Sequence, residues 1–302
     1  MPTNKLKNQL RFDNIPLQTI SVQGKLCKQE VSILRLDGLH EQVSGTKWFK
    51  LQYYLEAFFK SGKRMLATFG GAYSNHIAAT AAACRLLSIP CAGFIRGDEP
   101  SIFSPTLALA VEHGMQLRFV DRALYKDKDG IMQAYPSFYW VPEGGYGVLG
   151  MLGAADIWHH VPGKDRYSHV VLPVGSGTTV AGLLNGSDTR QHIVGVSVMK
   201  NNFSLEKEIK ALVDFSATEQ LELLHDYHFG GYAKKTAALI QFMDDVWETY
   251  RIPLDFVYSA KAFYALTEKL REGYFPATGK ILFIHTGGLQ GNKSLPEGSL
   301  HY

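Results

Sequence analysis

The sequence predicts an α/β protein in which mostly parallel sheets are covered by helices, and three observations support this fold class. Apolar runs typical of β-strands alternate with helix-type segments along the 302 residues. The runs are rich in Val, Ile and Leu with little polar–apolar alternation, which is typical of strands buried on both faces. Glycine-containing turns follow or adjoin several of them, at 69–73, 142–146, 174–179 and 286–289. Because ligands of such sheets bind at the carboxyl ends of strands, we expect these turns to share one cleft.

The individual elements follow from the same alternation. In chain order, the expected strands are the apolar runs at 31–36, 64–69, 91–95, 116–120, 170–174, 193–198 and 281–284. The expected helices are at 51–61, 74–87, 104–113, 149–160, 179–184, 233–250 and 259–272. The helix at 74 begins with polar N-cap candidates, and the helix at 179 begins directly after a Gly- and Thr-rich turn. No repeat or low-complexity linker marks a domain boundary.

Composition and charge exclude several classes of function. Hydrophobic residues make up 46% and charged residues 20%, as in an ordinary globular protein. The net charge of +3 is small, and no stretch is dense in Lys and Arg with interleaved aromatics, so we expect no nucleic-acid partner. No apolar run is long enough for a transmembrane helix, and residues 1–14 lack the apolar core of a signal peptide. Cys27, Cys84 and Cys91 form no CxxC pair, which favours reduced thiols in the cytoplasm.

The segment 170–184, VVLPVGSGTTVAGLL, is the most informative part of the chain. A buried strand is followed by a turn and then by a sequence that can begin a helix. The turn consists of Gly175, Ser176, Gly177, Thr178 and Thr179. Backbone N–H groups of a glycine-rich turn converge on an anion, and the helix N-terminus adds partial positive charge. The pattern therefore predicts a binding site for a phosphate group.

Two further segments carry reactive side chains. SGTKWFKL at 44–51 places Lys47 and Lys50 near a helix start, and a desolvated lysine can form an imine with a carbonyl compound. The sequence by itself does not choose between the two lysines, and a solvated residue is the ordinary alternative. In TFGGAYSNHIAA at 68–79, Ser74, Asn75 and His76 follow two glycines. They are either an ordinary helix cap or a polar cluster at the mouth of the sheet, where the hydroxyl could transfer a proton.

Other motifs fail on inspection. GGLQGNKS at 287–294 approaches the P-loop pattern, but Asn292 stands where a glycine is required. The pairs His159 with His160 and His225 with His228 lack further ligands nearby in the sequence, so we expect no metal site. No GxSxG segment is present, which removes the usual hydrolase signal.

Taken together, the segments resemble one enzyme family. The blocks SGTKWFKL, GGAYSNH, VPEGGYGVLG, PVGSGTTVAGL and VYSAKAF, the last followed by HTGG, occur in family order. The chain is similar to the tryptophan synthase β-like, fold type II enzymes that use pyridoxal 5′-phosphate. Within that class it resembles the group of 1-aminocyclopropane-1-carboxylate (ACC) deaminase and D-cysteine desulfhydrase. This resemblance implies two domains, with 51–150 as the smaller one and 1–50 plus 151–302 as the larger, cofactor-binding one. It also implies a homodimer.

The resemblance further implies a set of site residues. It assigns the covalent attachment of pyridoxal phosphate, as an imine, to Lys50, the lysine directly before Leu51. Asn75 would bind the ring hydroxyl of the cofactor, and Ser259 would meet the pyridine nitrogen. The phosphate would lie on Gly175, Ser176, Gly177, Thr178 and Thr179. Ser74 and Tyr258 would act on the substrate as catalytic groups together with Lys50, and Asn75 and His76 would also contact the substrate.

The residue expected at the pyridine nitrogen suggests the reaction. By resemblance, ACC deaminases carry a glutamate there and D-cysteine desulfhydrases a hydroxyl residue; this chain has Ser259. A neutral hydroxyl makes the ring a weaker electron sink, which suits β-elimination with its prompt loss of a leaving group. We therefore expect a lyase acting on a small amino acid and giving a 2-oxo acid, ammonia and, from cysteine, sulfide. ACC deamination is the alternative. A third hypothesis is a pyridoxal-phosphate-binding protein without turnover, and the bulky Trp48 and Phe49 beside Lys50 are its support.

Overall fold

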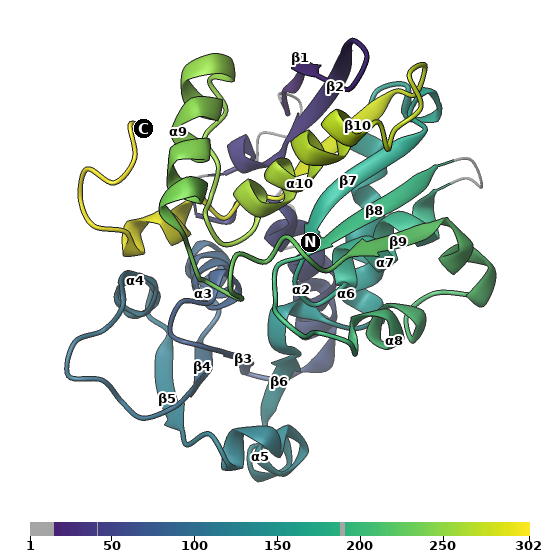
Figure 1. The fold of residues 1–302 in the computed structure, drawn as a ribbon. Helices are drawn as coiled ribbons and strands as arrows, with labels where there is room; N and C mark the ends of the chain where they lie inside the picture. The colour runs from purple at the N-terminus through teal and green to yellow at the C-terminus, as the bar shows by residue number, and fades with distance from the viewer. Residues whose placement is uncertain (1–14, 41, 188–190) are drawn as a thin grey trace.

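The computed structural model describes residues 15–40, 42–187 and 191–302 (Figure 1). The expectation that the first fourteen residues are not a signal peptide therefore lies outside the described residues. Within the described ranges, no helix combines the length and the apolar character needed to cross a bilayer.

The larger sheet has six strands in the order β1-β2-β10-β7-β8-β9. Its members are β1 (Leu17–Gln23), β2 (Lys28–Arg35), β10 (Ile281–His285), β7 (His169–Val174), β8 (His192–Ser197) and β9 (Leu221–Leu224). All neighbours are parallel except β1, which runs antiparallel to β2. Successive residues of a strand enter different cores, since Val171 packs with α9 (Ala237–Tyr250) and α10 (Ser259–Glu272), while Val170 and Leu172 pack on the opposite face. Burial on both faces explains the continuous apolar runs.

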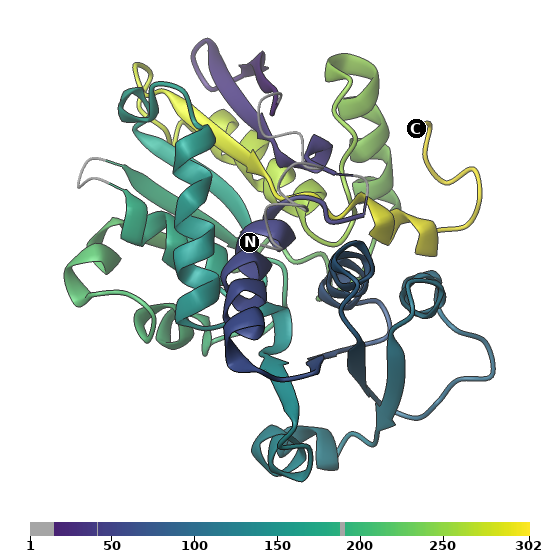
Figure 2. The ribbon, with the colours of Figure 1, turned by 180° about the vertical axis from the view of Figure 1, so that it is seen from behind.

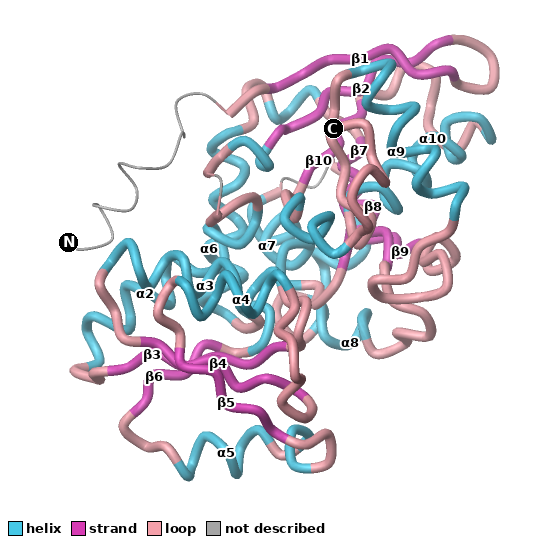
Figure 3. Tube along the Cα trace, turned by 90° about the vertical axis from the view of Figure 1, so that its left-hand side faces the viewer, coloured by secondary structure: helices cyan, strands magenta, loops and turns pink. Residues whose placement is uncertain are grey.

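The smaller sheet has four parallel strands in the order β5-β4-β3-β6. They are β5 (Gln116–Val120), β4 (Cys91–Arg96), β3 (Met65–Gly70) and β6 (Phe138–Val141). Helices α2 (Thr46–Ser61), α3 (Asn75–Leu87) and α4 (Pro105–Glu112) lie on one side, and α5 (Lys128–Ala134) lies on the other (Figure 3). On the α5 side, aromatic rings fill the core, with Phe69 stacked on Trp140 at 4.8 Å between centroids. Both sheets are thus covered by helices, as the sequence predicts.

Close helix packing fixes the start of α2 against the larger sheet (Figure 2). Helix α6 (Val148–Ala155) packs on α2 and on α7 (Thr178–Gly186). A Cβ atom at Gly153 would lie 1.8 Å from the Phe49 carbonyl oxygen, and one at Gly182 would lie 2.5 Å from the Ala154 Cβ. Glycine is therefore needed at both contacts, and the backbone of α2 is held in place where it carries Lys47 and Lys50.

The α/β class is confirmed, and each strand and helix expected from the sequence has a counterpart. Strands β1, β6 and β9, and helices α5 and α8 (Leu205–Lys210), were not expected. The expected helix start at residue 51 is wrong, because α2 begins at Thr46 after Gly45, whose φ is 63°. The Thr46 N–H donates to the Thr286 carbonyl at 3.2 Å, which ties this helix start to the end of β10. The two-domain division stays a prediction; the smaller sheet is built from strands within 65–141.

Candidate active site

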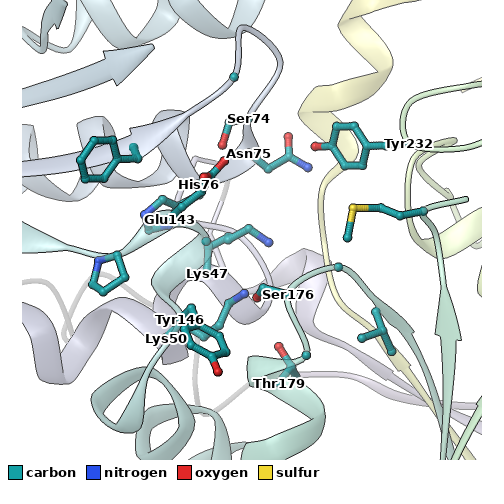
Figure 4. A pocket seen from close by; sticks show the side chains of 18 of the residues that line it. Lys47, Lys50, Ser74, Asn75, His76, Glu143, Tyr146, Ser176, Thr179 and Tyr232 are labelled. Atoms are coloured by element: carbon teal, nitrogen blue, oxygen red, sulfur yellow. The ribbon is translucent and has the colours of Figure 1, made fainter. Parts of the chain in front are cut away.

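A cavity of about 870 Å³ lies where the carboxyl ends of the two sheets face each other (Figure 4). Its wall comes from segments that directly follow strands: the β3–α3 turn, the residues after β6, the β7–α7 turn, the residues after β8 and the end of β10. The start of α2, the segment around Tyr232, the start of α10, helix α5 and Glu208 of α8 also contribute to it. The glycine turns expected to share one cleft do so.

Lys47 and Lys50 both line this cavity. Because α2 already begins at Thr46, the two lysines are separated by almost one helical turn and share a face. Trp48 and Phe49 therefore point elsewhere and are fully buried in the core, where the Phe49 ring meets that of His160 edge-on at 5.6 Å. The bulky residues beside Lys50 do not fill the cavity, which removes the observation that favoured a protein without turnover.

The two amines have lowered pKa values and different surroundings. Burial lowers the pKa of Lys47 to about 8, although the charge of Asp255 opposes the shift. Burial, together with the charge of Lys47, lowers the pKa of Lys50 well below its ordinary value. The Lys47 amine lies 5.5 Å from the ring centroid of Tyr258. The Lys50 Cβ would contact a Cβ at Gly145 at 3.1 Å, and the amine of Lys50 ends beside Ser176 in Figure 4.

The turn between β7 and α7 has the geometry expected of an anion site. Gly177 adopts φ 76° directly before α7, and a Cβ there would lie 2.5 Å from Cγ1 of Ile209, so only glycine fits. The Ser176 and Thr178 hydroxyls lie 3.0 Å apart. The first N–H groups of a helix have no partner within the helix, so those of α7 are available to an anion at this turn.

Ser74 and Asn75 lie at the start of α3 and line the same cavity. The Ser74 hydroxyl accepts the Ile77 N–H at 3.4 Å, so this residue is a helix cap and a cavity residue at once. The Asn75 Oδ1 atom is buried and has no hydrogen-bond partner among the residues that the structure describes. A buried amide oxygen in this state is costly, which indicates that a bound group completes it.

The hydrogen bonds of His76 determine where its proton lies. The Thr68 hydroxyl donates its single proton to the Val141 carbonyl at 2.8 Å. The Thr68 oxygen, 2.8 Å from Nε2 of His76, must then accept from that nitrogen. Burial and the charges of Lys50 and Lys47 lower the pKa of His76 well below its ordinary value, so the ring is neutral. Its Nδ1 is left as an acceptor.

Ser259 lies in a local hydrogen-bond network at the start of α10. Its side chain is fully buried, its hydroxyl donates to Oδ2 of Asp255 at 2.7 Å, and the Asp255 N–H donates to that hydroxyl at 2.7 Å. Ser259 is not among the residues that line the cavity, whereas Thr286, directly after β10, is. The contact of Ser259 with a pyridine nitrogen stays a prediction, and Thr286 is a second hydroxyl residue near this part of the cavity.

Tyr232 is a cavity residue that no sequence motif indicated. Its hydroxyl accepts a hydrogen bond from the Tyr258 hydroxyl at 3.2 Å, and the two rings meet edge-on at 5.9 Å. The Tyr258 proton is therefore engaged, while the proton of Tyr232 remains available to the cavity. Burial raises the pKa of both residues, that of Tyr258 well above its ordinary value. In the sequence, only the two glycines directly before Tyr232 indicate a special turn, and they do not specify a function.

His225 and His228, which lie outside the cavity, form hydrogen bonds with nearby residues. Nε2 of His225 lies 2.8 Å from Glu206, and Nδ1 of His228 accepts the Gly230 N–H at 3.0 Å. The described residues contain no group of three or more His, Cys, Asp and Glu side chains placed to hold a metal ion.

Comparison with known proteins agrees with this geometry. The profile of the family described as "Pyridoxal-phosphate dependent enzyme" matches residues 10–287, and the chain belongs to that family. A protein of Thermotoga maritima named "Putative 1-aminocyclopropane-1-carboxylate deaminase" is 30% identical over 283 residues, which cover 85% of this chain and 88% of the relative. A D-cysteine desulfhydrase of Salmonella choleraesuis is 26% identical over 319 residues, covering 95% and 97%. A crystal structure of an ACC deaminase homologue superposes with a TM-score of 0.77 at 28% identity, covering 96% of this chain and 95% of that one.

The chain is thus a pyridoxal-phosphate-dependent enzyme, and the resemblance noted in the sequence is confirmed. The residues present fit the cofactor. The β7–α7 turn offers N–H groups and hydroxyls for a phosphate, the unpartnered Asn75 Oδ1 offers an acceptor beside it, and two lysines of lowered pKa offer an amine for an aldehyde.

Proposed function

We propose that this enzyme is a lyase that eliminates the β-substituent of a small amino acid, D-cysteine or a close analogue, and releases a 2-oxo acid, ammonia and sulfide. The observation that carries the proposal is that, among the residues the structure describes, no carboxylate lines the cavity near the end of β10, where Thr286 forms part of the wall. Asp255 is the nearby acid, and its carboxylate is fully buried and occupied by the backbone N–H groups of Val257, Tyr258 and Ser259. A hydroxyl residue at the pyridine nitrogen of the cofactor suits β-elimination better than opening of the cyclopropane ring of ACC.

Different residues of the cavity would bind the phosphate, the ring hydroxyl and the pyridine nitrogen of the cofactor. Gly175, Ser176, Gly177, Thr178 and Thr179 would hold the phosphate, and Asn75 would bind the ring hydroxyl. Thr286 would meet the pyridine nitrogen, and Ser259 would support it through Asp255. When bound, pyridoxal phosphate supplies an electron sink for the Cα–H bond of an amino acid.

We assign the covalent attachment to Lys47 and not to Lys50, which revises the assignment drawn from the sequence. The aldehyde of the cofactor neighbours its ring hydroxyl, so the attaching lysine should lie near Asn75. Asn75 Nδ2 and the Asp255 carboxyl would lie 3.0 and 3.3 Å from a Cβ at Gly288, which makes them neighbours. Asp255 acts on the charge of Lys47 but is not among the groups that shift Lys50. In the view of Figure 4 the Lys50 amine ends next to Ser176, and we propose that it donates a hydrogen bond to the phosphate there.

The remaining polar residues of the cavity donate, accept or transfer protons. Ser74, at the end of the 71–74 turn, faces the cavity and can shuttle a proton at Cα. The Nδ1 atom of neutral His76 can accept a hydrogen bond from a group bound in the cavity. Tyr258 places Tyr232, whose free O–H faces the cavity, and the pair can donate to a leaving group. The amine of Lys47, when free and neutral, would serve as the base toward Cα of a bound amino acid.

The proposal is tested by a substrate screen combined with mapping of the lysine. The holoenzyme is incubated with D-cysteine, L-cysteine and ACC, and pyruvate, 2-oxobutanoate, ammonia and sulfide are measured. We expect pyruvate and sulfide from D-cysteine; 2-oxobutanoate from ACC without sulfide production would establish ACC deamination, which the names of several relatives favour. Borohydride reduction followed by peptide mass spectrometry should locate the cofactor on Lys47.

The matched variants are Lys47→Ala, Lys50→Ala and, as control, Lys60→Ala on the exposed end of α2. We expect Lys47→Ala to lose the covalent adduct, Lys50→Ala to weaken cofactor affinity, and Lys60→Ala to behave as wild type. An adduct on Lys50 would overturn the division of roles without affecting the reaction class.

We further propose a homodimer in the cytoplasm. The free thiols of Cys84 and Cys91 are buried and that of Cys27 is exposed, which agrees with a reducing compartment. Light scattering of the purified holoenzyme should give twice the chain mass of 33.6 kDa.

A further inference from the structure

Lys261 is a charged residue for which the proposed chemistry has no use. It lies on α10, one helical turn after Tyr258, and its side chain is fully buried. Its amine donates to the Gly231 carbonyl at 2.7 Å. Burial lowers its pKa to about 8, against the opposing charge of Asp255. Burying a lysine amine costs free energy, and the hydrogen bond to the Gly231 carbonyl offsets part of that cost.

The backbone around Gly231 is strained on both sides of Tyr232. Gly230 and Gly231 have φ of 91° and 125°, and the non-glycine residues Phe229 and Ala233 have φ of 51° and 53°. Left-handed conformations of such residues cost about 1–2 kcal/mol each and persist only where the surroundings impose them. The backbone–backbone hydrogen bonds of this turn are local, from Gly231 N–H to the His228 carbonyl and from Lys234 N–H to the Gly231 carbonyl.

Helix α10 supplies the long-range support for this segment. Lys261 holds the carbonyl directly before Tyr232, and the ring of Tyr264 meets that of Phe229 edge-on at 5.0 Å. The same helix begins with Tyr258, whose backbone N–H is held by Oδ1 of Asp255 at 2.8 Å. Both members of the tyrosine pair are therefore fixed from one helix, Tyr258 directly and Tyr232 through the amine of Lys261.

We infer that Lys261 is a positioning residue: its buried amine tethers the strained 229–233 segment so that the Tyr232 hydroxyl faces the cavity against Tyr258. The inference rests on the proposed function for the role of Tyr232, while the tether itself does not depend on any substrate. Without the amine, the segment can relax its left-handed residues and Tyr232 swings away from Tyr258.

The test compares Lys261→Met, which removes the donor at similar length, with Arg271→Met on the same helix, whose guanidinium pairs with Glu268 at the surface. Hydrogen–deuterium exchange of the holoenzyme is expected to rise about tenfold in peptides covering 226–236 for Lys261→Met, with the larger sheet unchanged. Unchanged exchange in that segment would overturn the tether. This readout works whether or not any amino acid is turned over, so it is independent of the proposed function.

The role in turnover is tested by a double-mutant cycle with Tyr232→Phe. Lys261→Met should lower kcat for D-cysteine about tenfold at unchanged cofactor occupancy, and should have less than about a twofold further effect in the Tyr232→Phe background. Equal losses in both backgrounds would show a general structural role and overturn the inference. Where Lys261→Met does not fold, Lys261→Gln, whose side chain is too short for the same bond, takes its place with the same expectations.

Discussion

At the scale of single residues, the lowered pKa of Lys47 gives its reaction with an aldehyde a pH profile. Only the neutral amine attacks an aldehyde, and the pKa of Lys47 is about 8, against an ordinary value of 10.5. We expect the rate at which apoenzyme incorporates pyridoxal phosphate to rise with pH and to level off above about pH 8. Stopped-flow absorbance of the cofactor band measures the rate, and a flat profile would contradict attachment to Lys47.

Residue spacing predicted the phosphate turn but not the partner of Ser259. The glycines and hydroxyls at 175–179 act through local geometry between one strand and one helix, which the sequence displays directly. Ser259 belongs to a cap in which Asp255, four residues earlier, captures its hydroxyl. Tyr232 lines the cavity with its hydroxyl bonded to that of Tyr258, a residue of another element. Such contacts depend on how distant segments fold together, and no local pattern records them.

At the scale of elements, the packing of α2 on α6 sets the position of both lysines. Gly153→Ala would place a Cβ 1.8 Å from the Phe49 carbonyl oxygen, an atom of the α2 backbone that cannot move aside alone. We expect a loss of about 1–3 kcal/mol in the free energy of unfolding and weaker cofactor binding, because α2 is displaced. Urea denaturation and cofactor titration measure the two effects. Gly38→Ala, where a Cβ would meet nothing within 4 Å, is the control and should change neither quantity.

Element boundaries explain one wrong sequence expectation. The sequence SGTKWFKL suggested a helix from residue 51, with bulky residues crowding a lysine in the preceding turn. The positive φ of Gly45 and the bond from Thr46 to Thr286 start the helix five residues earlier. Helical periodicity then separates Lys47 and Lys50 from Trp48 and Phe49, so the change of boundary removes the support for the third alternative, a protein without turnover.

At the scale of the whole molecule, the cavity joins the two sheets, since the smaller sheet contributes Ser74 and Asn75 and the larger one contributes the 175–179 turn and Thr286. A ligand that contacts both sheets and binds only the folded state stabilises them together, by about 2.7 kcal/mol at 100 times Kd. We expect pyridoxal phosphate to raise the unfolding midpoint of the apoenzyme by about 5 °C or more, in one calorimetric transition. Inorganic phosphate, which fills only the turn, should give a smaller rise. If the cofactor shifts one of two separate transitions and leaves the other in place, the bound cofactor contacts a single sheet and the shared cavity is not its site.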